Sequence, residues 1–453
     1  MSMHGDHRPI VTTAELTDVK ARLTRARPAL VARPATEIAE VLGRVGERFA
    51  DTGDRIREAA LRDLPGEAAL SPELAEAVVD GMVVDWSRER LVALLVAEFG
   101  DPGVLDRIVQ TGVTAAGAPV EPASLSRRVM AFGPSLCVQI SSGGVPGVGV
   151  NALIRSLLVK APTLIKPGAG DVTLTRLFVE ALAEEDRALG DAVAMRYWPG
   201  MDQELTGAAI EGADLVVAYG SDESVAAVRS LIPVTSRFVA YHHRFGVGLV
   251  GREALGHGVE DVAGDVARAV AMFEHRGCVC PHVVFVEHGG TAVPERFAEL
   301  VAEALAGLAE GWPAAAAAAS ATHEEAALRQ ARDTVEIHEA AGAARMMHGG
   351  GANWTVVFES EFADVPPLPG RSVRIRAVDD VAHVPTIMKP AGRHLQSVGY
   401  AGAEGRINEL AEMFGQAGAS RVVPFSRLSF PPAWWLHDGQ GPLKTLVRWV
   451  EVE

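Results

Sequence analysis

Two of the three cysteines stand one residue apart, in the stretch FEHRGCVCPHVVFVE over residues 273–287. They come just before an apolar run that predicts a buried strand. A cysteine thiolate at the entrance to a strand can act as a nucleophile toward an acyl group, if its surroundings control its pKa. Cys278 and Cys280 are therefore the candidates for covalent chemistry. The third cysteine, Cys137, lies inside the predicted strand SLCVQIS and is expected in the core.

A disulfide and a metal site are two other uses for such a pair. Cysteines separated by one residue cannot easily meet disulfide geometry. A zinc ion could bind Cys278, Cys280 and His282, but no second cluster in the sequence supplies the remaining ligands of a closed zinc site. We therefore expect free thiols and no metal.

The composition argues against several classes of partner. The chain has 453 residues, with Lys+Arg 42 against Asp+Glu 58, a net charge of −16 and a pI ≈ 5.4. A surface of this sign does not attract nucleic acid or an anionic membrane. No run of eighteen apolar residues predicts a membrane span, and the start MSMHGDHRPIVTTAELTD is not typical of a signal peptide. We expect a cytoplasmic protein with no nucleic-acid partner.

The elements that position the thiol pair follow from the apolar periodicity. The first 120 or so residues predict a helical lead-in, with Ser71 and Ser87 as N-caps. After it, amphipathic helices separate the apolar strands SLCVQIS, TLIKPG, AMRYWPG and ADLVVAYG, which is typical of a doubly wound parallel sheet. A second α/β set begins near RFGVGLVG and includes HVVFVE, NWTVVFE and SVRIRAV.

These patterns predict an α/β fold with two domains. Residues 1–250 would form the lead-in and a nucleotide-binding domain, and residues 251–430 a catalytic domain that carries the thiol. Residues 431–453 would form a C-terminal segment, which either pairs between subunits or packs on the core. A ligand is expected in the cleft between the two domains.

Three loops at predicted strand ends suit a dinucleotide, although no glycine-rich dinucleotide fingerprint occurs. The loop SSGGVPGVG over residues 141–149 lets backbone N–H groups approach an anion or an oxyanion. Lys166 ends a strand, and Gly220 and Ser221 open a helix, where anions bind. Each alone could be a turn glycine, a surface lysine or a helix cap. Three of them in order on successive strands favour a nucleotide site.

These features together carry a resemblance. The order of glycine-rich loop, Lys-Pro, Gly-Ser and a cysteine seven residues before a strand Phe resembles the aldehyde dehydrogenase superfamily. More specifically, RGCVCPHVVFVE, GRHLQSVGYAG, GASRVVPFSRLSFPPAWW and LHDGQGPLKTLVRWVEVE resemble the acyl-CoA reductase family that supplies fatty aldehyde to bacterial luciferase. The resemblance covers nearly the whole chain and implies an aldehyde-dehydrogenase-like fold.

The resemblance implies roles for individual residues. Cys278 lies seven residues before Phe285 and three before Pro281, which matches the family's Cys-x-x-Pro spacing, so it is the expected nucleophile. The superfamily's Gly-Gln-x-Cys motif would instead select Cys280, which we expect to be a small buried residue. Gly144 stands at the position of the superfamily's oxyanion-hole Asn, which leaves the backbone N–H of Cys278 as a donor.

The sequence departs from hydrolytic members of the superfamily at the general base. Their Glu-Leu-Gly-Gly stretch corresponds here to YHHRFGVGLVG, which contains no carboxylate. Water attack on an acyl-enzyme is then poorly supported, which favours thioester reduction. His242 and His243 are the other candidates for the base, although packing or hydrogen-bonded histidines are the simpler interpretation.

Cofactor choice rests on the loop after Lys166. In NAD-preferring relatives a carboxylate three residues after this lysine binds the adenosine ribose, and here that residue is Ala169. The loss of that charge permits a 2′-phosphate, which Lys166, followed by Pro167, could pair with. We expect NADPH as the cofactor, with NADH as the alternative.

The predicted function is NADPH-dependent reduction of an acyl thioester to an aldehyde through a covalent acyl-enzyme on Cys278. The acyl donor would be acyl-CoA or a protein-bound thioester, with an acyl-protein synthetase as a possible partner. Two alternatives are an acyl-transfer or acyl-holding protein without reductase activity, and a hydrolytic aldehyde dehydrogenase. The resemblance also implies a homo-oligomer.

Overall fold

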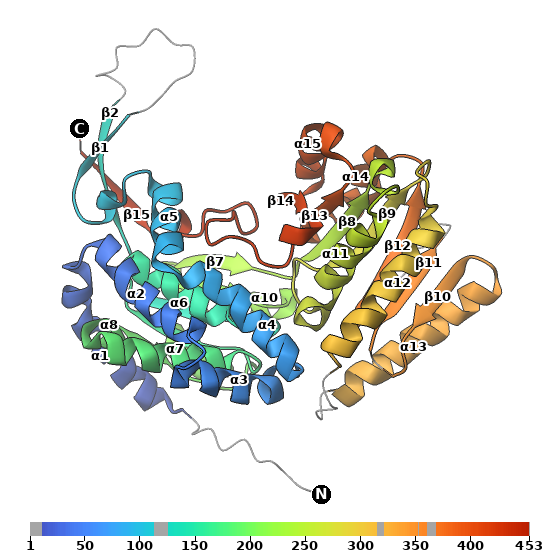
Figure 1. Ribbon diagram of the computed structural model, residues 1–453. Helices are drawn as coiled ribbons and strands as arrows, with labels where there is room; N and C mark the ends of the chain where they lie inside the picture. The colour runs from blue at the N-terminus through green and yellow to red at the C-terminus, as the bar shows by residue number, and fades with distance from the viewer. Residues whose placement is uncertain (1–10, 113–125, 315–320, 352, 360–367, 453) are drawn as a thin grey trace, which may run out of the picture.

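The computed structural model describes residues 11–112, 126–314, 321–351, 353–359 and 368–452. Two α/β lobes lie side by side (Figure 1). The first lobe combines the N-terminal helices with a five-stranded sheet, and the second is built on a seven-stranded sheet. The predicted fold class is confirmed.

The N-terminal part of the described chain is the predicted helical lead-in, and two of its helix starts test the predicted N-caps. It comprises α1 (Thr13–Val31), α2 (Ala35–Ala50), α3 (Arg55–Ala68), α4 (Pro72–Val83), α5 (Arg88–Phe99) and the 3-10 turns η1 (Val84–Trp86) and η2 (Pro102–Leu105). The Ser71 hydroxyl accepts a hydrogen bond from Leu74 N at 3.1 Å, as an N-cap should. Ser87 is the N-cap residue of α5, as predicted, but its hydroxyl donates to the Val84 carbonyl at 3.2 Å and accepts no capping hydrogen bond. The lead-in also ends earlier than expected, because strand β1 (Val109–Gly112) follows it.

The first sheet is parallel throughout, with strand order β5-β4-β3-β6-β7. Its strands are β3 (Cys137–Ile140), β4 (Thr163–Lys166), β5 (Val193–Met195), β6 (Leu215–Tyr219) and β7 (Arg237–Tyr241). The connecting helices are α6 (Val148–Leu158), α7 (Val172–Glu185), α8 (Arg187–Asp191), α9 (Gln203–Ile210) and α10 (Asp222–Arg229). The chain winds outward from β3 in one direction and from β6 in the other. Ligands of open parallel sheets bind at such a reversal, beyond the carboxyl ends of the strands.

The second sheet has the order β10-β11-β12-β9-β8-β13-β14, and only β10 runs antiparallel to its neighbour among these strands. Its strands are β8 (Phe245–Val250), β9 (Pro281–Glu287), β10 (Ala344–His348), β11 (Thr355–Glu359), β12 (Ser372–Val378), β13 (Leu395–Ala401) and β14 (Arg421–Pro424). The helices are α11 (Val259–Ala271), α12 (Pro294–Gly311), α13 (Ala321–Ala340), α14 (Val384–Met388) and α15 (Ile407–Ala417). The chain passes from one sheet to the other between Tyr241 and Phe245, slightly before residue 250.

A small antiparallel sheet, in the order β1-β2-β15, joins the C-terminal strand to a pair of strands between the helical lead-in and β3. Strand β15 (Arg448–Val452) pairs with β2 (Ser126–Phe132), so the C-terminal segment is anchored on the first lobe. Trp449 and Val450 stay 44% and 40% exposed. Before it reaches β15, the segment crosses from the second lobe to the first (Figure 1).

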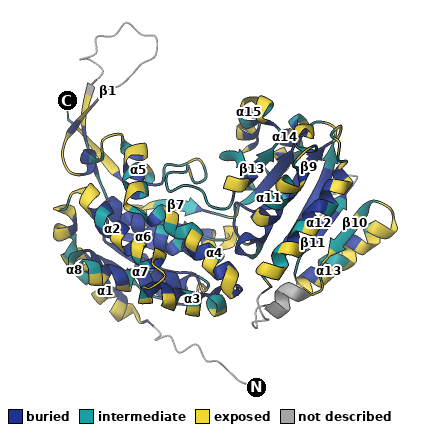
Figure 2. Cartoon of the chain, viewed as in Figure 1, coloured by how far each residue is buried: buried dark blue, intermediate teal, exposed yellow. Residues whose placement is uncertain are grey.

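Buried residues fill both lobes, with exposed residues on the outer faces of the helices (Figure 2). In the first lobe the rings of Phe49, Trp86 and Phe178 pack against one another, with centroids 5.3 to 6.4 Å apart. Cys137 is fully buried on β3, as predicted. No helix in the described part of the chain is long and apolar enough to cross a membrane.

Candidate active site

The predicted nucleotide loops meet at one edge of the first sheet. Strands β4, β3 and β6 are parallel neighbours, so the loops that follow them emerge on the same side. The loops after β3 and β4 touch through glycines, because a Cβ on Gly168 would lie 2.1 Å from the backbone nitrogen of Gly143. Asp171 also joins them, since its carboxylate accepts hydrogen bonds from Gly147 N at 2.7 Å and from Gly149 N at 2.6 Å. The glycine-rich loop is therefore held from the β4 side.

Lys166 is placed at the end of β4, but it is not the surface lysine of the alternative interpretation. It is only 8% exposed, and this burial lowers the pKa of its ammonium group. Its Nζ lies 5.7 Å from the centroid of the Tyr197 ring. Pro167 is buried and Ala169 is exposed on the same loop. An anionic ligand would compensate the cost of burying this ammonium group.

Gly220 and Ser221 lie at the end of β6, next to the reversal of strand order. Ser221 is the N-cap of α10, and its hydroxyl accepts a hydrogen bond from Ser224 N at 3.2 Å. The N–H of Gly220 donates to the Tyr241 carbonyl at 3.1 Å, which ties this loop to the end of β7. The structure thus brings all the predicted nucleotide residues to the edge of the sheet where a dinucleotide would bind.

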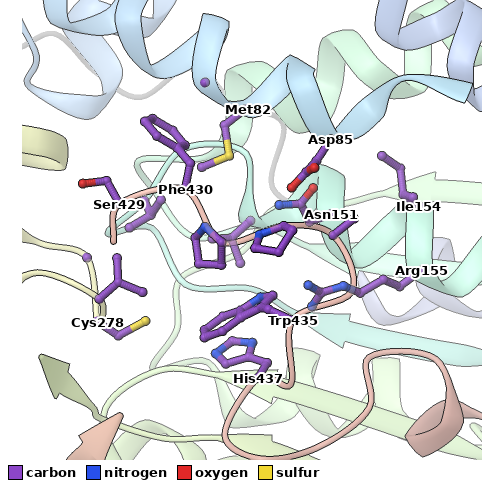
Figure 3. Close-up of a pocket in the computed structure, with 18 of the residues that line it drawn as sticks. Met82, Asp85, Asn151, Ile154, Arg155, Cys278, Ser429, Phe430, Trp435 and His437 are labelled. Atoms are coloured by element: carbon purple, nitrogen blue, oxygen red, sulfur yellow. The ribbon is translucent and has the colours of Figure 1, made fainter. Parts of the chain in front are cut away.

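The two neighbouring cysteines point to different places. Cys280 is 1% exposed, and its Sγ lies 3.6 Å from the Met272 carbonyl oxygen. Cys278 is partly exposed and lines an internal hollow between the lobes, which we call the chamber (Figure 3). On an extended segment two residues spaced in this way would share a face. Here residues 277–280 form a turn, in which Cys280 N donates to the Gly277 carbonyl at 3.0 Å. Of the two, Cys278 is the one that a ligand in the chamber could reach.

The turn before Cys278 has an uncommon backbone. Phe273, Glu274 and His275 have φ values of 57°, 53° and 61°, a left-handed conformation that costs energy for residues other than glycine. Buried Arg371 donates to both carboxylate oxygens of Glu274, at 2.7 and 2.5 Å. The two ring nitrogens of His275 lie 3.0 and 3.1 Å from backbone carbonyl oxygens. These contacts hold the strained turn and so fix the start of the cysteine loop.

The chamber is mostly apolar. It encloses about 120 Å³, close to the size of an engineered cavity that holds benzene. Its lining comes from α4, α5, α6, the cysteine loop and the C-terminal segment, and includes Met82, Leu91, Leu94, Val145, Val148, Ile154, Phe273, Phe430 and Trp435. Figure 3 shows these elements converging on one space, with Cys278 at one side. A chamber of this size and lining suits a small apolar group.

Three residues distant in the sequence surround the Cys278 thiol. The Gln396 side-chain amide donates to Asp438 Oδ1 at 2.6 Å, and Arg244 Nε lies 3.4 Å from Asp438 Oδ2. Burial of the thiol raises the pKa of Cys278 to about 12, and the charge of Asp438 adds to this. A hydrogen bond with Gln396 and the charge of Arg244 act in the opposite direction. Without a ligand the thiol is therefore protonated at neutral pH.

His437 is a second titratable group in the wall of the chamber. Its ring stacks between Tyr241, at 4.2 Å, and Trp435, at 4.5 Å. Burial and the nearby charges of Arg155 and Arg244 hold the pKa of His437 well below its ordinary range, so the imidazole is neutral. Its buried Nδ1 has no hydrogen-bond partner among the described residues. A neutral, unpartnered imidazole nitrogen can accept a proton.

The predicted substitutes for a general base lie elsewhere. His242 and His243 follow β7, and neither lines the chamber. Tyr241, just before them, is 5% exposed and stacks on Tyr219 at 4.6 Å. A carboxylate does lie near the thiol, but it is Asp438 from the C-terminal segment. Its Oδ1 accepts the hydrogen bond from Gln396, and its Oδ2 is ion-paired with Arg244 but accepts no hydrogen bond among the described residues.

Gly144 lies against the cysteine loop. A Cβ at this position would be 3.4 Å from the Arg276 carbonyl oxygen, so a side chain would meet the backbone two residues before Cys278. This places the loop after β3 beside the nucleophile candidate, as the predicted oxyanion position requires. No side chain at residue 144 can donate a hydrogen bond.

A second hollow, which we call the outer hollow, shares part of its wall with the chamber. It encloses about 630 Å³, and Phe430, Pro432 and Trp435 line both spaces. Arg90, Arg421 and Arg427 also line it. The guanidinium of Arg90 lies 4.3 Å from the Trp434 ring centroid, and that of Arg421 lies 5.7 Å from Trp435. On a chain of net charge −16, this gathering of arginines and aromatic rings suits an anionic ligand.

Reasoning from the sequence did not identify Arg244, Gln396, His437 or Asp438. The segments GRHLQSVGYAG and LHDGQGPLK were noted only for their resemblance to a family. Gln396 and Asp438 are 42 residues apart, and only the packing of the C-terminal segment against β13 brings them together. No local spacing in the sequence predicts this contact.

Comparisons with known proteins identified a matching family and related individual proteins. A family model described as acyl-CoA reductase (LuxC) matches residues 30–449. A long-chain acyl-protein thioester reductase of Aliivibrio fischeri is 22% identical over 424 residues, covering 92% of this chain and 82% of that protein. The enzyme of the same name from Photobacterium phosphoreum is 22% identical over 428 residues, covering 92% and 80%.

Solved structures with this fold are aldehyde dehydrogenases. A NAD-dependent benzaldehyde dehydrogenase from Corynebacterium glutamicum has a TM-score of 0.70 at 16% identity, covering 98% of this chain and 91% of that one. An NADP-dependent glyceraldehyde-3-phosphate dehydrogenase from Bacillus halodurans, complexed with NADP, has a TM-score of 0.71 at 13% identity, covering 98% and 92%. At these identities the likeness shows the fold alone.

Proposed function

Because the chain belongs to the acyl-CoA reductase (LuxC) family, we propose that it reduces an acyl thioester to an aldehyde through an acyl group carried on Cys278. The observation that supports this most directly is the placement of the thiol in an apolar chamber beside a nucleotide-type sheet edge. The thiol supplies a nucleophile and the chamber a place for the acyl chain. The loops after β3, β4 and β6 suit a nicotinamide dinucleotide.

The first step is acyl transfer to the protein. The Cys278 sulfur attacks the thioester carbonyl, a new C–S bond forms, and the bond to the donor sulfur breaks. Because burial raises the pKa of Cys278 to about 12, the thiol proton needs an acceptor. We assign this role to the neutral imidazole of His437. Because its pKa is held well below the ordinary range, the proton passes through the imidazole to the departing thiolate as the new C–S bond forms, without a lasting imidazolium.

The second step is reduction of the Cys278 thioester. When bound, the nicotinamide cofactor supplies a hydride for this step. The backbone N–H of Cys278 is the donor that can stabilise the oxyanion at the former carbonyl, since Gly144 offers no side chain. Cleavage of the C–S bond then releases the aldehyde and returns the thiolate, which takes up from solvent the one proton that the overall reduction consumes.

The chamber disfavours the hydrolytic alternative. Tyr241 is buried in an aromatic stack, and Asp438 is engaged by Arg244 and Gln396. Tyr241 offers no carboxylate, and the Asp438 carboxylate is already paired with the Arg244 guanidinium, so we expect the acyl-enzyme to persist until the hydride arrives. The acyl-transfer alternative shares the first step and differs only in lacking the second.

NADPH is the proposed cofactor, with NADH as the alternative. The exposed Ala169 places no negative charge near a 2′-phosphate, and the ammonium group of Lys166 lies at the end of the same strand loop. A phosphate would compensate the cost of burying that ammonium.

The outer hollow is the proposed place for the leaving half of the donor. Its three arginines and the Trp434 and Trp435 rings suit the phosphates of CoA or of a carrier-bound phosphopantetheine. Acyl-CoA and a protein-bound thioester, delivered by an acyl-protein synthetase, are both compatible with this. A homo-oligomer that pairs through the β15 edge is also proposed, because Trp449 and Val450 are exposed there.

The test of this function follows NADPH absorbance during incubation of the purified chain with a fatty acyl-CoA, with aldehyde and free CoA measured in parallel. Equal amounts of NADPH consumed, aldehyde formed and CoA released would support the reductase. Release of CoA with a stable acyl-protein and no NADPH consumption would support acyl transfer instead. Formation of NADPH from NADP and aldehyde without CoA would support the hydrolytic oxidase.

A further inference from the structure

Outside the chamber, one cluster of metal-ligating side chains lies at the junction of the two lobes. A carboxylate oxygen of Asp222 and one ring nitrogen each of His242 and His394 all lie within 4.8 Å of one another. Among the described residues, no other group of three or more His, Cys, Asp or Glu side chains gathers this closely.

The backbone orients both imidazoles of this cluster. Nδ1 of His242 and Nδ1 of His394 each lie 3.1 Å from the carbonyl oxygen of His243. When Nδ1–H donates to this carbonyl, the lone pair of the neutral ring is on Nε2. A hydrogen bond from the other ring nitrogen to a backbone carbonyl is the usual support for a metal-binding histidine. For His394, this places the lone pair on the nitrogen that is 4.0 Å from Asp222 Oδ2.

The carboxylate is held as well. Asp222 is the first residue of α10, and its Oδ1 accepts a hydrogen bond from His243 N at 3.2 Å. His242 Nδ1 lies 3.5 Å from the same oxygen. The three side chains are 51%, 32% and 27% exposed for Asp222, His242 and His394, so an ion can enter from solvent. Small side-chain rotations would bring the donors to ligand distance.

The cluster joins elements from both lobes. Asp222 and His242 belong to the first lobe, after β6 and β7, whereas His394 precedes β13 of the second lobe. An ion bound to all three would therefore tie the lobes together at the seam. Two imidazoles and one carboxylate, with room for water, are the donors that zinc and similar divalent ions prefer. Magnesium and calcium favour oxygen ligands and fit this set poorly.

We infer that Asp222, His242 and His394 bind one divalent transition-metal ion, of which zinc is the natural example, across the junction of the two lobes. The site is separate from Cys278 and does not depend on the reaction proposed above. Because Asp222 directly follows Ser221, the bound ion would lie beside the proposed nucleotide loop and would restrain how the lobes move around it.

The experiment titrates Co²⁺, and then competing Zn²⁺, into the full-length chain without nucleotide, following the visible spectrum of bound Co²⁺. All proteins carry Cys278→Ser, so that the reactive thiol cannot supply a ligand. We expect one ion per chain with a spectrum typical of nitrogen and oxygen ligands. His394→Gln and Asp222→Asn should each weaken binding by more than the roughly 10- to 100-fold that the loss of an outer-shell partner costs. His257→Gln, which changes an exposed histidine away from the cluster, is the matched control and should bind as before.

Asp222→Asn keeps a side chain that can accept the hydrogen bond from His243 N, so it should leave the fold intact, which circular dichroism would check. Three results would overturn the inference. They are the absence of saturable binding at millimolar Co²⁺, equal affinity in the His394, Asp222 and His257 variants, and a sulfur-to-metal charge-transfer band that shows cysteine coordination. None of these results bears on whether Cys278 carries an acyl group.

Discussion

At the scale of single residues, Cys278 combines access with low intrinsic reactivity. Its sulfur borders the chamber, while burial and the charge of Asp438 raise its pKa to about 12. The thiolate is therefore a small minority species at neutral pH. Its fraction, and hence the reactivity of the free thiol, should increase with pH as long as the pH stays below that pKa.

We predict that alkylation of Cys278 by iodoacetamide accelerates by about tenfold per unit between about pH 7 and 9, because the thiolate fraction rises tenfold per unit below the pKa. Asp438→Asn removes a negative charge, so it should lower the pKa of Cys278 and speed alkylation at pH 7. Site-resolved mass spectrometry measures both rates, with the buried Cys280 as internal reference. An alkylation rate that does not change with pH would contradict the raised pKa.

His437 is predicted to carry the proton of the Cys278 thiol. His437→Phe keeps an aromatic ring between Tyr241 and Trp435 but removes the proton acceptor. Acyl transfer from acyl-CoA should slow by roughly 10²- to 10⁴-fold, the usual contribution of a positioned base, while the melting temperature changes little. Stopped-flow measurement of CoA release gives the rate, and His257→Phe is the control. Acyl transfer at the normal rate in His437→Phe would contradict the assignment of His437 as the proton acceptor.

At the scale of elements, the sequence predicted the position of a functional residue where that position depends only on the residue's own strand and the loop that follows it. Strand periodicity predicted that Lys166, Gly220 and the glycine-rich loop follow successive strands of a parallel sheet. In the structure these strands are parallel neighbours, so the loops emerge at one edge. The network around the thiol could not be predicted this way. The contact between Gln396 and Asp438 depends on how the C-terminal segment packs against β13, and the buried state of Lys166 depends on its tertiary neighbours.

The prediction about cofactor choice concerns Lys166, at the end of β4, and Ala169, in the loop that follows. Lys166→Ala should raise the KM for NADPH more than that for NADH, because only NADPH has a 2′-phosphate for the ammonium to pair with. Ala169→Glu should act in the same direction by repelling that phosphate, and should favour NADH. Steady-state kinetics with each cofactor measures the ratio. Equal effects on both cofactors would show that this loop does not discriminate between them.

At the scale of the whole molecule, the chamber exists because the C-terminal segment crosses from the second lobe to the first. The sequence predicted two α/β domains and a ligand between them, and the fold class is confirmed. It did not predict that residues 429–437 line the chamber, since an aromatic and proline-rich stretch has no periodicity to place it. The same stretch separates the chamber from the outer hollow.

The outer hollow is predicted to hold the phosphates of the acyl donor. Arg427→Glu should raise the KM for acyl-CoA by about three- to tenfold, with a smaller effect at high salt, because it reverses a partly screened surface charge. The same acyl group on pantetheine, which has no phosphate, should be used equally well by both proteins. Arg25→Glu, an exposed change on α1, is the charge-matched control. If Arg427→Glu raised the KM equally for acyl-CoA and for acyl-pantetheine, the phosphates of the donor would have to bind elsewhere.

The central claim is that Cys278 holds an acyl group that waits for hydride, and intact-protein mass spectrometry tests it directly. After the chain is mixed with a fatty acyl-CoA and no nucleotide, we expect one acyl adduct that persists and then disappears on addition of NADPH, with an equal amount of aldehyde released. Cys280→Ala should form the adduct and Cys278→Ala should not. An adduct retained in Cys278→Ala but lost in Cys280→Ala, or rapid decay to free acid without NADPH, would contradict the account.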